Sequence, residues 1–267
     1  MLEMPYHPTT LAWWRNLPNN PIYQREKGRW GEANPYYSKF KRYAPFFILG
    51  AIMLGLCAGY SNPTLLATGN GLGAIWCLLC LPGMVQSIVT WLGSVMAGVM
   101  TAPSVCLERT NGTWEILRLV PQSPQAILLA KLFGSLARLQ IIWVTLFLLT
   151  LIQGAVLLFS SLFIDQLGVG SFAAFLTLIR PWQDILFTAL WGMTLSTWTK
   201  SATVALAGTF AGLLVMKGLS SFSWFMIIWA IQSDSMLLFL PVLGPVLLYG
   251  LAIVILLALL PGRAAAL

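Results

Sequence analysis

The sequence contains very little charge. Asp, Glu, Lys and Arg together make up 9% of its 267 residues, whereas 58% of the residues are hydrophobic. The mean hydropathy is +0.81. A soluble domain needs more polar residues than this to cover its surface, so the composition excludes an ordinary soluble domain and indicates a polytopic membrane protein.

The residues that support catalysis and cofactor binding are also scarce. There is no glycine-rich phosphate loop of the G-x-x-x-x-G-K-[ST] kind, so we expect that the chain does not hydrolyse ATP itself. The single histidine, His7, lies in the polar N-terminal segment, which argues against metal, haem, iron–sulfur or histidine-ligated chlorophyll sites in the spans. Among the Ser and Cys residues of the spans we identify no nucleophile with an activating base. We therefore expect no enzymatic activity, no metal and no cofactor.

Cysteine usage does not indicate a disulfide framework. Cys57, Cys77, Cys80 and Cys106 all fall within or at the edge of apolar stretches. Cys77 and Cys80 form a C-x-x-C pair that would share one face of a helix, but a redox or metal site needs polar surroundings. We interpret them as small residues buried in the membrane.

The apolar stretches are continuous rather than alternating, so they predict membrane-spanning helices and an all-α fold. A bilayer core of about 30 Å takes about 20 apolar residues per helix. On this basis residues 1–43 form a cytoplasmic N-terminal interfacial segment, and 44–262 form a transmembrane domain of about six helices. The predicted spans lie near 44–61, 75–104, 132–160, 182–199, 202–219 and 239–260.

Two segments leave the assignment open. Residues 161–181 could lengthen the fourth helix or lie along the membrane surface. Residues 220–234 are short for a span and favour a re-entrant or interfacial helix.

The basic residues predict the orientation, because Lys and Arg concentrate in cytoplasmic segments. The six-span arrangement places thirteen of the fifteen on one side and leaves Arg180 and Lys217 near the outer ends of spans. Residues 1–43 show no apolar core followed by a cleavage site, so we expect both termini in the cytoplasm. The thirteen are Arg15, Arg25, Lys27, Arg29, Lys39, Lys41, Arg42, Arg109, Arg118, Lys131, Arg138, Lys200 and Arg263.

Few ionisable residues are expected in the middle of the spans. Arg180 and Asp184 form an i,i+4 pair at an outer helix end, where they could gate an outer vestibule or form a structural surface pair. The lack of a buried carboxylate disfavours a proton- or ion-coupled carrier, and an apolar path suits a hydrophobic or lipid-like substrate. The Trp and Phe residues could hold pigments or quinones, but interfacial belts are the simpler interpretation. The basic N-terminal segment is explained by topology and lipid headgroups rather than nucleic acid.

The longest regular polar stretch, Glu108 to Lys131, follows the second predicted span. Thr113 could cap a short helix over 114–120 that stops at Pro121, with Glu115 favourably placed in its first turn and with Trp114 and Leu117 turned toward lipid or protein. Ser123 and Pro124 then predict the start of the next helix, as N-cap and first helical residue. The charged side chains expected to be available to a partner are Glu108, Arg109, Glu115 and Arg118.

This stretch resembles the characteristic segment of ABC-2 type transporter permeases. In that family a Glu-Arg pair, a Gly-Thr and a Trp-Glu precede a Pro, a Ser-Pro and an Ile-Leu-x-Ala-Lys-like run. The segment Asn20 to Trp30 is similar to the family's N-terminal interfacial helix, with Arg25-Glu26 as its Arg-Glu pair. The matching residues in the longer stretch are Glu108-Arg109, Gly112-Thr113-Trp114-Glu115, Pro121, Ser123-Pro124 and Ile127 to Lys131.

The resemblance implies a permease subunit in a bacterial-type cytoplasmic membrane, working as a homodimer or with a homologous chain, and surrounded by membrane lipids. A separate ATP-binding subunit would dock on a coupling helix between helices 2 and 3, with the N-terminal helix as second contact; export is the family's usual direction. Two departures, Gly28 with Gly31 in the N-terminal helix and Thr110-Asn111 after the Glu-Arg pair, keep an alternative open. This is a non-transporting structural subunit of an electron-transfer or photosynthetic membrane complex.

Overall fold

The computed structural model of the chain describes residues 17–28, 42–43, 45–46, 72–120, 122–163, 167–231 and 240–266, and every regular element among them is helical. After a short 3-10 helix, η1 (Leu17–Asn19), the elements are α-helices. They are α2 (Pro21–Glu26), α5 (Leu72–Thr101), α6 (Ser104–Thr110), α7 (Thr113–Arg118), α8 (Pro124–Ala137), α9 (Gln140–Phe163), α10 (Leu167–Trp198), α11 (Ala202–Ile231) and α12 (Leu240–Ala266).

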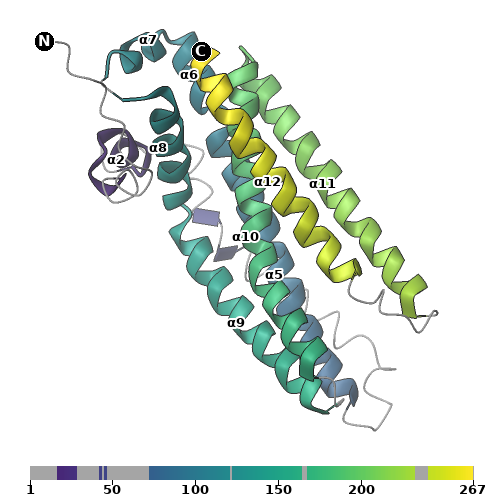
Figure 1. The fold of residues 1–267 in the computed structure, drawn as a ribbon. Helices are drawn as coiled ribbons and strands as arrows, with labels where there is room; N and C mark the ends of the chain where they lie inside the picture. The colour runs from purple at the N-terminus through teal and green to yellow at the C-terminus, as the bar shows by residue number, and fades with distance from the viewer. Residues whose placement is uncertain are drawn as a thin grey trace, which may run out of the picture.

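The long helices form a bundle around α10, which packs against α5, α9, α11 and α12. Figure 1 shows these helices running side by side, with the short helices α6 and α7 gathered at one end. The apolar side chains Ile185, Leu190 and Met193 of α10 are fully buried in the common core. Because α10 is enclosed on several sides, several of its polar residues are buried as well, among them Asp184, Thr188 and Ser196.

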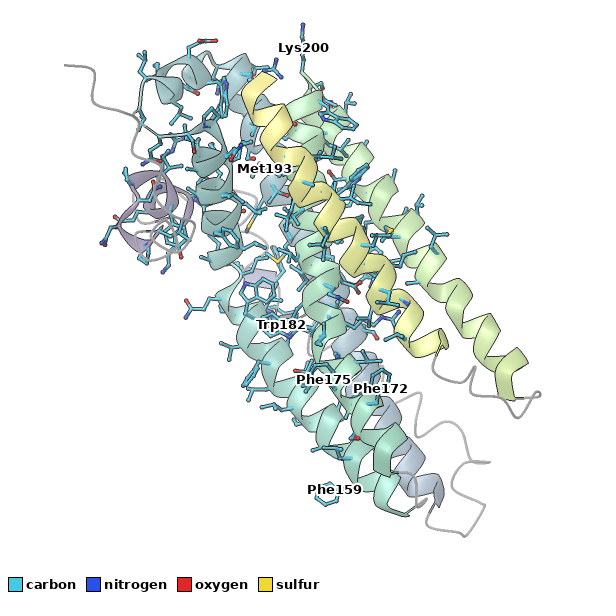
Figure 2. The ribbon with its side chains drawn as sticks, viewed as in Figure 1. Phe159, Phe172, Phe175, Trp182, Met193 and Lys200 are labelled. Carbon is cyan, nitrogen blue, oxygen red and sulfur yellow. The ribbon has the colours of Figure 1, made fainter. Side chains whose placement is uncertain are left out.

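One end of the bundle, which we call the α7 end, carries α6, α7 and the C-terminal end of α12 (Figure 1). Lys200 lies at this same end, whereas Phe159 of α9 lies at the opposite one (Figure 2). The short helix α2 packs against α8 on the flank of the bundle. The charge distribution predicted this grouping, since Arg25, Arg109 and Lys200 were all assigned to one side.

The described helices support a multi-pass membrane protein. Three are long and apolar enough to cross a bilayer, over Val85–Thr110, Ala202–Ser220 and Leu243–Leu260, and the pair α8 and α9 adds a fourth if it is counted as one span. Apart from residues 45–46, the predicted span 44–61 lies outside the described residues, as do Cys57 and the segment 1–16. The count of six spans therefore stays a prediction.

The third predicted span, 132–160, is wrong as a single helix. It is divided between α8 and α9, which meet at an angle of 66°. The bend falls at Arg138 and Leu139, whose backbone N–H groups bond three residues back to Ser135 and Leu136. The indole N–H of Trp143 donates to the carbonyl of Leu136 at 2.8 Å, so a side-chain contact spans the bend.

Two helices are longer than predicted. Helix α10 begins at Leu167 and continues through Pro181, so of the two alternatives left open for 161–181 the longer fourth helix holds from residue 167 onward. Helix α11 continues to Ile231, so the expectation of a re-entrant or interfacial helix over 220–234 is wrong for the described part. No Gly or Pro interrupts residues 220–231, and a helix persists in apolar surroundings because it satisfies its own backbone groups. As a result Lys217 lies in the middle of α11.

Glycines allow the central helices to approach closely. A Cβ atom added to Gly192 of α10 would lie 2.6 Å from the Thr101 hydroxyl oxygen and 3.2 Å from the backbone nitrogen of Ala102. A Cβ on Gly98 would lie 3.1 Å from a methyl group of Thr209 in α11. Small residues at helix contacts are the usual way that membrane helices pack without a hydrophobic driving force between them.

We predict that Gly192→Ala destabilises the bundle by about 1–3 kcal/mol, because the new methyl group meets backbone that cannot move aside. Gly218→Ala in α11 is the matched control, since nothing lies within 4 Å of its added Cβ. Thermal unfolding of the purified protein in detergent, followed by size-exclusion chromatography, measures both. Equal midpoints for the two variants would contradict the close approach of α5 and α10.

Candidate functional site

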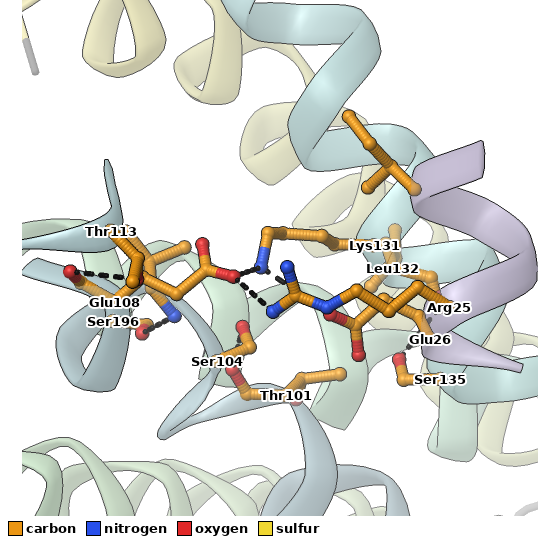
Figure 3. A network of polar contacts seen from close by, with 12 residues as sticks. Arg25, Glu26, Thr101, Ser104, Glu108, Thr113, Lys131, Leu132, Ser135 and Ser196 are labelled. Carbon is orange, nitrogen blue, oxygen red and sulfur yellow. Dashed lines mark hydrogen bonds and ion pairs between the residues drawn. The ribbon is translucent and has the colours of Figure 1, made fainter. Parts of the chain in front are cut away.

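Four charged side chains from three helices meet at the α7 end. The Glu108 carboxylate of α6 lies 2.6 Å from the Lys131 ammonium of α8 and 2.9 Å from the Arg25 guanidinium of α2. The same lysine lies 3.4 Å from the Glu26 carboxylate. Figure 3 shows this arrangement, with Lys131 and Arg25 converging on one oxygen of Glu108. We call these four residues the charge network.

The centre of the charge network is buried. The side chain of Lys131 is 2% exposed and that of Glu108 is 8% exposed, whereas Arg25 is 53% exposed. A buried charge is tolerated only when a partner of opposite sign compensates it, and loss of one partner leaves the other strongly destabilising. The Glu108–Lys131 contact therefore fixes α6 against α8, and Arg25 and Glu26 attach α2 to both.

Helix α2 is short but defined at both ends. The Asn20 side chain accepts a hydrogen bond from the Ile22 N–H, and Pro21 occupies the first helical position, where its missing N–H costs nothing. The helix stops at Glu26, earlier than the predicted segment to Trp30, and Gly28 follows with a φ of +86°. The Asn20 amide also donates to Gln122 just before α8.

Close contact between α2 and α8 depends on Gly134. A Cβ atom there would lie 2.5 Å from the Cβ of Glu26 and 3.0 Å from the Tyr23 carbonyl oxygen. Any larger residue would push α2 away from α8. Glycine at this position therefore places Glu26 within reach of Lys131.

Helix α6 is anchored to α10 by a hydroxyl from outside the helix. Its N-cap, Pro103, offers no side-chain cap, and the Ser196 hydroxyl accepts hydrogen bonds from the N–H groups of Val105 and Cys106 at 3.0 and 3.1 Å. These N–H groups belong to the first turn, which has no partners within its own helix. The Arg109 guanidinium donates to the Thr197 carbonyl, so both ends of α6 are bonded to the end of α10.

Helix α7 presents a mixed outer face. It begins after Gly112, whose φ of +71° places the N-cap in the left-handed region, and the Thr113 hydroxyl donates to the Glu108 carbonyl at 3.2 Å. Glu115 is exposed, Ile116 is 66% exposed and Leu119 is 84% exposed. We call Glu115, Ile116 and Leu119, with exposed Arg109 and Thr113, the α7 surface.

Several sequence predictions for this stretch need correction. Thr113 is not the N-cap, because Gly112 takes that position and turns the chain. Trp114 and Leu117 do turn toward protein, as predicted: Trp114 is 3% exposed in the core, and Leu117 packs against this core. Glu108 was expected to be available to a partner, but it is buried and supports the surface from inside.

Other predictions for the stretch agree with the structure. Ser123 caps α8 by accepting a hydrogen bond from the Ala126 N–H, and Pro124 is the first helical residue. Glu115 lies in the first turn of α7, where an acidic side chain is favourable. Arg118 is the last residue of α7, and its side chain lies outside the described atoms. That these residues contact an ATPase stays a prediction.

The predicted pairing of Arg180 with Asp184 is wrong. The Asp184 carboxylate instead forms an ion pair with Lys217 of α11, and its side chain is 3% exposed. Asp184 is the eighteenth of 32 residues in α10, so the pair lies within the bundle and not at its outer end. The sequence argument that no buried carboxylate occurs in the spans therefore loses its premise.

Sequence reasoning missed three residues that the structure makes important: Lys131, Ser196 and Lys217. Lysines inside otherwise apolar helices were the available signal for two of them, because a charge there requires a partner. No sequence signal identified Ser196, since one hydroxyl among many Ser and Thr residues does not reveal which helix it caps.

Comparison with known families gives a match over nearly the whole chain. The family model described as ABC-2 family transporter protein matches residues 21–261. This range includes α2, the charge network, the α7 surface and most of α12. Neither the curated proteins nor the solved structures gave a match.

We predict that Glu108→Gln destabilises the protein by about 3 kcal/mol, because it leaves the Lys131 ammonium buried with Glu26 as its remaining acidic neighbour. The matched control, Glu115→Gln, removes an exposed carboxylate on the next helix and should leave the unfolding midpoint nearly unchanged.

The double variant Glu108→Gln/Lys131→Met should recover part of the lost stability, because it removes both buried charges together. Thermal unfolding in detergent measures all three variants. If the single and double variants unfolded alike, the charge network would not be a coupled unit.

Proposed function

The chain belongs to the ABC-2 family of transporter proteins, and we propose that it is the permease subunit through which a separate ATPase subunit drives transport of a hydrophobic or lipid-like substrate. The α7 end would face the cytoplasm of a bacterial-type cell, where ATP is available. A second copy or a homologous chain would complete the pathway, and export is the direction we propose.

The observation that supports this proposal most strongly is that the exposed helix α7 follows directly on α6, which the buried charge network holds in place. Ile116 and Leu119 expose large apolar side chains beside the charged groups of Glu115 and Arg109. Apolar side chains at a water-facing end, bordered by charge, are typical of a protein-binding surface. A soluble subunit with a complementary pocket would bury Ile116 and Leu119 at its centre.

The contacts behind the α7 surface could transmit a movement of α7 to the membrane helices. The Glu108 carboxylate leads to Lys131 in α8, and the Ser196 hydroxyl leads to α10 at the centre of the bundle. The buried ion pair joins α6 to α8, and the two hydrogen bonds to Ser196 join α6 to α10. Because these contacts hold α6 firmly to both helices, a displacement of α7 would move α8 and α10 rather than bend α6. Helix α8 then meets α9 at the 66° bend, where a change of angle could open a path.

An apolar substrate suits the remaining surfaces of the described bundle. Helix α9 exposes Val144, Phe147, Leu148 and Leu151, and α12 exposes Leu247 and Leu251. These faces suit contact with lipid, with a second permease chain, or with a substrate that travels along the protein surface. They offer no strongly polar lining for a large hydrophilic solute.

We predict that Glu115→Lys and Ile116→Asp reduce permease-stimulated ATP hydrolysis by at least about tenfold, because each places an unfavourable group at the centre of the docking surface. The matched control is Gln140→Lys, which adds a positive charge at an exposed position outside the α7 surface. The measurement is ATP hydrolysis by the reconstituted permease and ATPase subunits, with co-purification as a measure of assembly.

Unchanged hydrolysis in both α7 variants would overturn docking at this surface. If the native chain co-purified with redox or pigment-bearing membrane subunits and no ATPase, the α7 surface would instead be an assembly contact in a non-transporting complex.

A further inference from the structure

An ion pair within the membrane-spanning bundle is the strongest unexplained feature of the molecule. The Asp184 carboxylate of α10 accepts a hydrogen bond from the Lys217 ammonium of α11. Lys217 is the sixteenth of 30 residues in α11, so both partners lie near the middle of long apolar helices. Ionisable side chains at such positions carry a large desolvation cost and usually mark a functional site.

Two polar atoms beside this pair have unmet hydrogen-bonding capacity. The second carboxylate oxygen of Asp184, Oδ1, and the Tyr249 hydroxyl of α12 are buried, and neither has a hydrogen bond of standard geometry within the described part of the chain. The hydroxyl interacts with the Asp184 carboxylate and with the Ser220 hydroxyl, but these contacts leave hydrogen-bonding capacity for a further donor. Phe187 packs edge-on against the Tyr249 ring at 5.5 Å and 87°, which holds the hydroxyl in place. Buried polar atoms without partners are rare in native proteins and require an explanation.

The Lys217 ammonium also has spare donors. It carries three N–H groups, and one hydrogen bond, to Asp184, is described for it. Its side chain is 25% exposed, whereas that of Asp184 is 3% exposed. A ligand that approaches along the outer face of α11 therefore meets the lysine first and the aspartate behind it.

Charge balance restricts the ligand. An anionic group alone would bind Lys217 but leave Asp184 buried without its counter-ion. A cationic group alone would bind Asp184 but leave Lys217 without its counter-ion. An unpaired buried charge is strongly unfavourable. A group that carries both charges can separate the pair and compensate each side.

We propose that Asp184, Lys217 and Tyr249 form an intramembrane binding site for a zwitterionic amphiphile, whose primary ammonium binds Asp184 and Tyr249 and whose phosphate binds Lys217. The N–H groups of the ammonium satisfy Asp184 Oδ1 and the phenol oxygen. A trimethylated ammonium has the same charge but no N–H donor, so the site discriminates against it.

The surroundings favour an amphiphile over a free zwitterion. Around Lys217, α11 exposes Leu214, Val215 and Leu219, each more than half exposed. These side chains provide an apolar track that lipid tails can follow while the headgroup reaches the ion pair. The site assigns a headgroup class to the proposed lipid-like substrate. Its role in transport rests on the proposed function.

The test uses the purified full chain in nanodiscs that contain phosphatidylethanolamine and its mono-, di- and trimethylated forms, the last being phosphatidylcholine. Native mass spectrometry counts the lipid molecules retained per chain. We expect retention to fall as N–H groups are replaced by methyl groups, with at least about a tenfold preference for the primary ammonium over the trimethylated form. Soluble glycerophosphoethanolamine is the competitor that tests for a free zwitterion.

Asp184→Asn should abolish the preference, whereas Lys217→Met removes the phosphate contact that all four lipids share and should lower the retention of every one of them. Lys200→Met removes a lysine at the exposed end of α10 and should leave the preference intact. The charge exchange Asp184→Lys/Lys217→Asp keeps a paired interior and controls for folding, which is checked by size-exclusion chromatography.

Equal retention of all four lipids would overturn the proposal, as would an unchanged preference in Asp184→Asn. Displacement by the soluble competitor at equal concentration would also overturn it, because the ligand would then not be an amphiphile. Retention is measured without an ATPase subunit, so its failure is distinct from a failure of docking at the α7 surface.

Discussion

The contact between Glu108 and Lys131 is the interaction on which the α7 end depends. Both side chains are almost completely buried, so removal of either would leave the other as an uncompensated buried charge and destabilise the fold. The contact joins α6 to α8, and because Arg25 and Glu26 attach to the same atoms, it also determines where α2 lies. The orientation of the α7 surface then follows from the position of α6, whose N-terminal amides bond to Ser196.

This arrangement separates the two tasks that the proposed docking role requires. The outward residues Ile116 and Leu119 are free to be complementary to a partner, because they take no part in holding α7 in place. The inward residues Trp114 and Glu108 hold α7 and α6 but are hidden from a partner. Under the proposed docking role, a movement imposed on the surface would reach α8 and α10, and through α10 the Asp184–Lys217 pair that links α10 to α11.

The sequence predicted the helical class, the surface helix and the start of α8, because each depends on local signals such as the Ser123-Pro124 cap and continuous apolar length. It did not predict the bend at Arg138 and Leu139, which has no proline and depends on packing around Trp143. Because a span needs only about 20 residues, the predicted helix was ended at residue 219, although α11 continues to Ile231. This error assigned Lys217 to the end of a helix rather than to its middle. The partners of Glu108 and Asp184 could not be identified either, since Lys131, Arg25 and Lys217 are distant in sequence and meet them only after the helices pack.

The most direct test of the account is to identify what touches the α7 surface in native membranes. A photo-crosslinking amino acid at position 116, with a second at exposed position 140 as control, would be activated before solubilisation, and the products identified by mass spectrometry. The account predicts a stoichiometric crosslink from position 116 to a soluble protein that carries an ATP-binding phosphate loop. Capture of integral membrane subunits alone, or of the same products from both positions, would contradict it.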